Sequence, residues 1–180
     1  MITRFRVSPE GFCRAHETKT WALKRVAFVI PVVYLYVNFR IDRMTCCEEL
    51  LYCSGKMRRI FFARSSNGDI PAKEFLDSAK RGSVATWGKL DRILKRLSDF
   101  GQIRNKEQFR PVGDDLWEVK EGGGKRLVGY FSYSHFILTH GFEKRGGGKA
   151  SNKFPPTERE RALRIKSEFE MELTRMIRGR

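Results

Sequence analysis

Three apolar segments separated by short turns make up residues 116–142, and they decide the expected fold: Leu116-Trp-Glu-Val-Lys120, Arg126-Leu-Val-Gly-Tyr-Phe-Ser-Tyr133 and His135-Phe-Ile-Leu-Thr-His-Gly-Phe142. Their β-branched and aromatic residues favour strands. Gly122-Gly-Gly124 supplies the first turn and Ser134 the second, and connections this short join antiparallel neighbours. The stretch therefore predicts a three-stranded antiparallel meander.

The segments before the meander predict one strand and two helices. Arg59-Ile-Phe-Phe-Ala63 has the composition of a strand. Pro71 suits a first helical turn and precedes an apolar stripe at helical spacing. A second helix is expected between Ser83 as its N-cap and Gly101 just after its end. Its expected inward face consists of Val84, Trp87, Leu90, Leu94 and Leu97.

A last helix is expected after Pro155-Pro156. Thr157 and Glu160 have the spacing of a capping box. The apolar stripe of this helix consists of Ala162, Ile165, Phe169, Leu173 and Met176. The resulting order, β-α-α-β-β-β-α, predicts a small α+β domain in which helices pack on a twisted antiparallel sheet.

Residues 1–56 differ in character from residues 57–180, so we expect two parts: an atypical, poorly ordered N-terminal extension at 1–56 and the working domain at 57–180. An upstream start-codon assignment would explain the extension, because Met57 opens the recognisable domain. Residues 26–37 form an apolar run that Pro31 interrupts, and twelve residues are too few to span a bilayer comfortably. A signal peptide, a buried strand and a weak membrane anchor remain alternatives for this run.

The cysteines favour a reducing compartment. All four lie in the first 53 residues, without the C-x-x-C pair of a zinc site. Cys13 and His16 have ligand-like spacing, but no second pair accompanies them. We therefore expect reduced thiols in a cytoplasmic protein with no metal, no cofactor and no membrane association.

The charge indicates an anionic partner. The chain has 36 Lys and Arg against 21 Asp and Glu, a net charge of +15, and most of the surplus lies after residue 56. Nucleic acid, ribosome, acidic membrane and acidic protein all fit this surplus. The Gly-rich loop at 146–151 lacks the spacing of a phosphate-binding P-loop, which argues against nucleotide hydrolysis.

Several segments, in this order, resemble the RelE/ParE superfamily of type II toxins, in particular its phage-derived HigB-like branch. They are Ile70-Pro-Ala-Lys-Glu-Phe-Leu-Asp77, Leu116-Trp-Glu-Val-Lys120, Lys125-Arg-Leu-Val-Gly-Tyr130, Phe136-Ile-Leu-Thr-His-Gly-Phe-Glu-Lys-Arg145 and Thr157-Glu-Arg-Glu-Arg-Ala162. The likeness covers residues 57–180 and implies a RelE-like domain. It also implies an mRNA endonuclease that acts in the ribosomal A site, and a cognate antitoxin, expected to be a helix-turn-helix protein.

The resemblance implies a metal-independent reaction in which the RNA 2′-OH attacks the adjacent phosphate. Fixed Arg and Lys side chains would stabilise the charge on that phosphate. The basic positions of the family correspond here to Lys120, Arg126 and the pair Lys144-Arg145. Glu118 shares a strand face with Lys120 and is a candidate base or a residue that orders Lys120. His140 and Tyr130 are further candidates for proton transfer, and a structural role is the alternative for His140.

The sequence departs from the family in ways that keep two other functions open. No Tyr or His follows Phe142, although some relatives have one near the C-terminus. A ParE-like inhibitor of DNA gyrase and a catalytically inactive nucleic-acid-binding relative are therefore the alternatives to a ribosome-dependent endoribonuclease.

Overall fold

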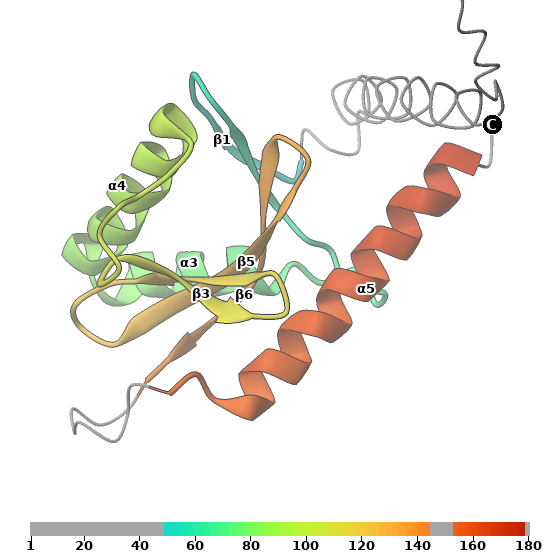
Figure 1. The fold of residues 1–180 in the computed structure, drawn as a ribbon. Helices are drawn as coiled ribbons and strands as arrows, with labels where there is room; N and C mark the ends of the chain where they lie inside the picture. Colours follow the sequence, from blue (N-terminus) through green and yellow to red (C-terminus); the bar gives the residue numbers. More distant parts are fainter. Residues whose placement is uncertain (1–48, 145–152, 179–180) are drawn as a thin grey trace, which may run out of the picture. The chain divides into compact units, whose positions relative to one another are not determined.

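A computed structural model describes residues 49–144 and 153–178 (Figure 1). Its elements are, in chain order, β1 (Leu51–Ser54), β2 (Arg59–Phe62), α3 (Pro71–Gly82), α4 (Val84–Phe100), β3 (Phe109–Gly113), β4 (Leu116–Lys120), β5 (Lys125–Ser132), β6 (His135–Glu143) and α5 (Pro156–Arg178). The expected α+β class is confirmed. None of the helices described is long and apolar enough to cross a membrane. The apolar run at 26–37 and the cysteines at 13, 46 and 47 lie outside the described residues.

The described strands form one mixed sheet in the order β1-β2-β6-β5-β4-β3. The expected meander is present as β4, β5 and β6, which pair antiparallel, and β3 adds a fourth strand to it. The expectation of a wholly antiparallel sheet is wrong, because β2 pairs parallel to β6. The direction of β2 relative to β6 depends on the path that the chain takes through α3 and α4. Local sequence patterns carry no information about this path.

Two strands had no clear signal in the sequence, and both are edge strands. β3 contains Pro111 and ends at Gly113, residues that are depleted in strands and tolerated at sheet edges. β1 has only four residues, and its pairing with β2 shifts register between Leu51 and Cys53. Short, irregular edge strands resist pairing with other chains and also lack the alternation by which strands are recognised.

The helices cover opposite faces of the sheet. On one face, α3 packs so closely against β6 that a Cβ on Gly141 would overlap the Phe75 ring. On the other face, Lys166 of α5 lies over Tyr130 of β5, with its Nζ 5.0 Å from the ring centroid. Figure 1 shows α5 running along the sheet and past it. The sheet is therefore the middle layer between the α3–α4 pair and α5.

The second expected helix is largely confirmed. The Ser83 side chain accepts a hydrogen bond from the backbone N–H of Thr86, and Gly101 ends α4 with a φ of 72° in the left-handed region. The buried side of α4 consists of Leu90, Ile93, Leu94, Leu97 and Ser98. Val84 was expected in the core but is 68% exposed: it is the first residue of α4, and the buried residues of this helix begin at Leu90.

The expected capping box of the last helix is wrong. α5 begins at Pro156, so Thr157 already lies inside the helix and cannot be its N-cap. The backbone N–H of Arg159 donates to the carbonyl oxygen of Pro155 at 3.1 Å, which is the first bond of this helix. A proline is well suited to a first helical position, and Pro156 occupies it here.

The hairpin of β1 and β2 crosses the boundary that the sequence placed at Met57. Leu50 is buried in the core, and the Tyr52 hydroxyl donates to Asp91 of α4 at 2.7 Å. The backbone N–H groups of Met57 and Arg58 both donate to the carbonyl oxygen of Ser98, at 3.0 and 2.9 Å. Residues 50–55 are thus part of the same sheet and core as the rest of the domain.

Removal of residues 1–56 should destabilise the domain, because it removes β1 together with Leu50 and Tyr52. We expect a chain that begins at residue 57 to have a free energy of unfolding lower by about 3 kcal/mol or more than a chain that begins at residue 49. Urea denaturation of both chains measures this difference. Equal midpoints would show that β1 contributes nothing to stability.

Gly55 should tolerate no side chain, because a Cβ at this position would overlap the backbone carbonyl group of Ser98. We expect Gly55→Ala to lower the free energy of unfolding by more than about 2 kcal/mol. Gly88→Ala is the matched control, since a Cβ there meets nothing within 4 Å in the interior of α4. The control should raise stability by about 0.5–1 kcal/mol. Unchanged stability of Gly55→Ala would contradict this packing.

Candidate nucleic-acid interface

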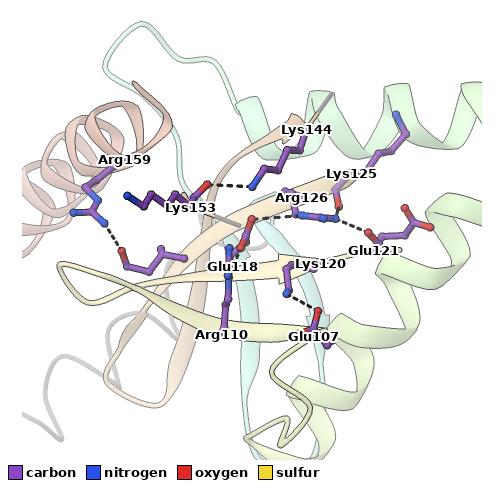
Figure 2. A network of polar contacts seen from close by, with 11 residues as sticks. Glu107, Arg110, Glu118, Lys120, Glu121, Lys125, Arg126, Lys144, Lys153 and Arg159 are labelled. Atoms are coloured by element: carbon purple, nitrogen blue, oxygen red, sulfur yellow. Dashed lines mark hydrogen bonds and ion pairs between the residues drawn. The ribbon is translucent and has the colours of Figure 1, made fainter. Parts of the chain in front are cut away.

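Basic side chains from neighbouring strands gather on the α5 face of the sheet, beside the part that α5 covers (Figure 2). The register places Arg110 of β3 opposite Glu118 of β4, and Lys120 of β4 opposite Arg126 of β5. Side chains two residues apart on a strand share a face, so all four point to the same side. Lys144, the residue after β6, lies beside them. We use the name basic cluster for five residues: Arg110, Glu118, Lys120, Arg126 and Lys144.

Glu118 is the centre of the basic cluster. Its side chain is 1% exposed and accepts a hydrogen bond from Nε of Arg110 at 2.7 Å through Oε2. Its other oxygen, Oε1, lies 3.5 Å from Nε of Arg126. A buried carboxylate needs such partners, because an unpaired charge inside a protein is costly. Glu118 therefore holds the two arginines, one from each neighbouring strand.

Arg126 is fixed by backbone groups as well as by Glu118. Its Nη1 donates to the carbonyl oxygen of Lys125 at 3.0 Å and to that of Glu121. The tight β4–β5 turn brings these carbonyl groups together, with Gly124 at a φ of 102°. The guanidinium is therefore held in one orientation before any ligand arrives.

Lys120 is paired outside the cluster. It is 7% exposed, and its Nζ lies 3.2 Å from Oε2 of Glu107, a residue in the loop before β3. Its backbone N–H donates to the carbonyl oxygen of Gln108 at 2.8 Å. Glu118 therefore pairs with the two arginines, whereas Glu107 pairs with Lys120.

Lys144 joins the cluster from the end of β6. Its backbone N–H donates to the carbonyl oxygen of Gly124 at 2.9 Å, and its Nζ donates to that of Lys153 at 3.1 Å. Partial desolvation lowers the pKa of the Lys144 ammonium. Among the charged neighbours, the Glu118 carboxylate opposes this change, whereas three nearby cations add to it: Arg110, Arg126 and Lys120. A lysine with a lowered pKa is better suited to proton transfer than an ordinary surface lysine.

The first turn of α5 borders the cluster. Arg159 donates from Nη2 to the carbonyl oxygen of Val112 in β3 at 2.6 Å, and its Nη1 lies 3.6 Å from Oδ2 of Asp114. These contacts fix the start of α5 against the β3–β4 hairpin (Figure 2). Arg145, the second residue of the expected basic pair, lies outside the described residues.

The structure separates His140 and Tyr130 from the basic cluster. His140 is fully buried, its Nε2 lies 3.0 Å from Oε2 of Glu158 in α5, and its Nδ1 lies 3.2 Å from the hydroxyl oxygen of Thr139. Burial lowers the pKa of His140 to about 3, and Arg161 adds to this effect. The imidazole is therefore neutral near pH 7, and its contact with Glu158 is a hydrogen bond rather than an ion pair. This position favours the structural role for His140.

Tyr130 is also fully buried, and its hydroxyl has no hydrogen-bond partner among the described residues. Burial, and to a smaller extent Glu170, raise the pKa of this phenol above its usual range. Neither Tyr130 nor His140 is accessible to a ligand at the surface of the basic cluster.

Two residues of the site were missed from the sequence, Arg110 and Glu107. Arg110 lies on β3, a strand that was not predicted, so its place opposite Glu118 could not be inferred. Glu107 lies in a loop, where no periodicity assigns a partner. Within the described ranges, no three His, Cys, Asp or Glu side chains gather closely enough to hold a metal ion.

Comparison with known proteins adds no assignment to this geometry. The chain matched no model of a protein family and no curated protein.

The buried His140 should make stability depend on pH. Its pKa is about 3 when folded and about 6.5 in its reference state, so below pH 6.5 the unfolded chain takes up a proton that the folded protein does not. We expect this residue to reduce the free energy of unfolding by about 2 kcal/mol between pH 7 and pH 5. Urea denaturation at both pH values, with His140→Gln as the control that cannot titrate, isolates this contribution. Equal changes in the wild type and the control on acidification would contradict it.

Proposed function

We propose that the protein is the toxin of a type II toxin–antitoxin system of the RelE/ParE superfamily and that it inhibits translation as a ribosome-dependent mRNA endonuclease. The observation that carries the proposal is the basic cluster itself. Four cations from three adjacent strands and the segment after β6 gather at one site of the sheet, and one buried carboxylate holds two of them. These are also positions at which the sequence resembles the toxin family, with Arg110 as an addition.

The cluster has the chemistry that a phosphodiester requires. Guanidinium groups present several donors in a plane and bind phosphate oxygens through paired hydrogen bonds. Arg126 is already fixed by Glu118 and by backbone carbonyl groups, so little reorganisation accompanies binding. Arg110 and Arg126 remain 23% and 16% exposed, which leaves part of each side chain accessible to a nucleic acid.

The proposed reaction uses the RNA as its own nucleophile. The 2′-OH loses its proton to the neutral form of Lys144, and the 2′ oxygen attacks the adjacent phosphorus. The bond from phosphorus to the 5′ oxygen breaks, and that oxygen takes up a proton from an ammonium group, for which Lys120 is the candidate. The products are a 2′,3′-cyclic phosphate and a 5′-hydroxyl end. Arg126 stabilises the negative charge that develops on the phosphate oxygens.

The proposed partners fit the same surface. mRNA and ribosomal RNA are polyanions, and a chain with a net charge of +15 attracts them at long range. The proposed antitoxin, an acidic or helix-turn-helix protein, would cover the basic cluster and block docking on the ribosome. The proposal places the protein in the cytoplasm, where its target is.

A ParE-like gyrase inhibitor, or a nucleic-acid-binding relative without catalysis, is the second candidate. The observation that favours it is the burial of His140 and Tyr130, which leaves the described part of the cluster without an accessible histidine or tyrosine for proton transfer. In that case the basic cluster would bind a nucleic acid or gyrase without cutting RNA.

Induction of the full chain in growing cells, followed by mapping of mRNA ends, tests the proposal. We expect new 5′-hydroxyl ends in translated messages and a loss of polysomes. Lys144→Ala should reduce cleavage by about 100-fold or more, because it removes the proposed base. Arg164→Ala is the control, since Arg164 is an exposed arginine of α5 outside the cluster, and it should leave cleavage unchanged.

Intact messages with normal polysome profiles would contradict the endonuclease. A supercoiling assay with purified gyrase then separates the two remaining cases. Inhibition of gyrase would support the ParE-like function, and salt-dependent RNA binding without inhibition would support an inactive relative.

A further inference from the structure

We infer that Glu118 is a positioning residue and not the base of the reaction, and that it holds Arg110 and Arg126 together as a clamp on one phosphate of the substrate. Arg110 is thereby a further phosphate-binding residue. The inference rests on the proposed function and assigns two roles within that site.

The burial of Glu118 argues against a role as base. A general base must come within hydrogen-bond distance of the 2′-OH that it deprotonates. The Glu118 side chain is 1% exposed, and each of its oxygens faces an arginine, Oε2 towards Arg110 and Oε1 towards Arg126. A substrate hydroxyl would have to displace one of these ion pairs to reach the carboxylate.

The same contacts place the two guanidinium groups on either side of one carboxylate. Both arginines use Nε for Glu118 (Figure 2), and Nη1 of Arg126 is held by the carbonyl oxygens of Glu121 and Lys125. Nη2 is therefore the nitrogen of Arg126 that would meet the phosphate. Without Glu118 the two cations would repel each other, and with it they are held at fixed positions. The strand register supports this arrangement, because Glu118 lies directly opposite Arg110 on the neighbouring strand.

The charge of the clamp fits the transition state better than the substrate. Arg110 and Arg126 around Glu118 carry one positive charge in excess, and Lys144 adds a second once it has taken the proton of the 2′-OH. A phosphodiester carries one negative charge, whereas the phosphorane formed by attack of a 2′ oxyanion carries two. Interactions that strengthen in the transition state raise kcat more than they lower KM. Loss of Arg110 should therefore affect mainly kcat.

Cleavage of mRNA on purified, programmed ribosomes tests the two roles with the full chain. We expect Arg110→Gln to lower kcat about 10-fold and to change KM less than about 3-fold.

Glu118→Gln, which keeps the shape of the side chain and loses its charge, should lower kcat about 10- to 100-fold. In this variant the rate should still rise with pH, because Lys144 still titrates. The rise should occur at lower pH than in the wild type, because the Glu118 carboxylate raises the pKa of Lys144 and its removal lowers that pKa. The double variant Arg110→Gln with Glu118→Gln should lose less than the product of the two single losses, because the residues act through each other.

Arg104→Gln is the matched control, an exposed arginine in the loop before β3 and outside the basic cluster, and it should behave as wild type. A rise of rate with pH in the wild type that disappears in Glu118→Gln would overturn the positioning role and make Glu118 the base. Equal kinetics of Arg110→Gln and Arg104→Gln would overturn the clamp. Additive losses in the double variant would overturn the coupling between the two residues.

A binding measurement separates failure of the clamp from failure of the proposed function. The probe is a single-stranded RNA with 2′-O-methyl groups, which cannot be cleaved by its own 2′-OH. We expect Arg110→Gln to reduce the slope of log K against log salt by about 0.7, the value for one lost phosphate contact, and Arg104→Gln to leave it unchanged. If the wild type cleaves no RNA, the proposed function fails. The salt slope then tests by itself whether Arg110 binds a phosphate as part of the clamp. An unchanged slope in Arg110→Gln then overturns it.

Discussion

The ion pairs of Glu118 with two arginines constrain the rest of the sheet. The carboxylate lies on β4, one arginine on β3 and the other on β5, so the contacts exist only if all three strands keep their register. A slip of one residue would turn Glu118 towards the opposite face of the sheet, among the apolar side chains under α3 and α4. The cost of an unpaired buried charge therefore acts against every such alternative. The proposed phosphate clamp and the strand register depend on the same three side chains.

The division of the sheet into two faces explains which polar groups can meet a ligand. α5 covers one part of its face, and there His140 and Tyr130 are fully buried. The basic cluster lies beside this covered part, where Arg110 and Arg126 keep partial exposure. The start of α5 is fixed to β3 through Arg159, so the helix borders the cluster at a defined position. The position of α5 thus decides that His140 stabilises the fold and that the cluster remains accessible.

Local signals in the sequence were sufficient for α3, α4 and the strands β4 to β6. Ser83 and Gly101 bound α4 as expected, since capping depends on the residues of the helix end itself. The parallel pairing of β2 with β6 depends on contacts between distant segments, and no local pattern encodes it. Arg110 was missed for a related reason, because Pro111 obscures the strand that carries it. Glu118 and Arg126 were predicted as site residues, but their mutual contact depends on the strand register.

The basic cluster is a costly arrangement if stability alone is considered. Replacement of a buried ion pair by apolar residues of similar volume is often neutral or stabilising. The presence of the Glu118–arginine pairs therefore does not imply that they stabilise the fold. Lys120 adds to the cost, because it is 7% exposed while its partner Glu107 is 86% exposed and can give only a weak pair. The desolvated Lys144 lies in the same network. Charges gathered in this way at one site of the sheet are better explained by an anionic ligand that completes their neutralisation than by the needs of the fold.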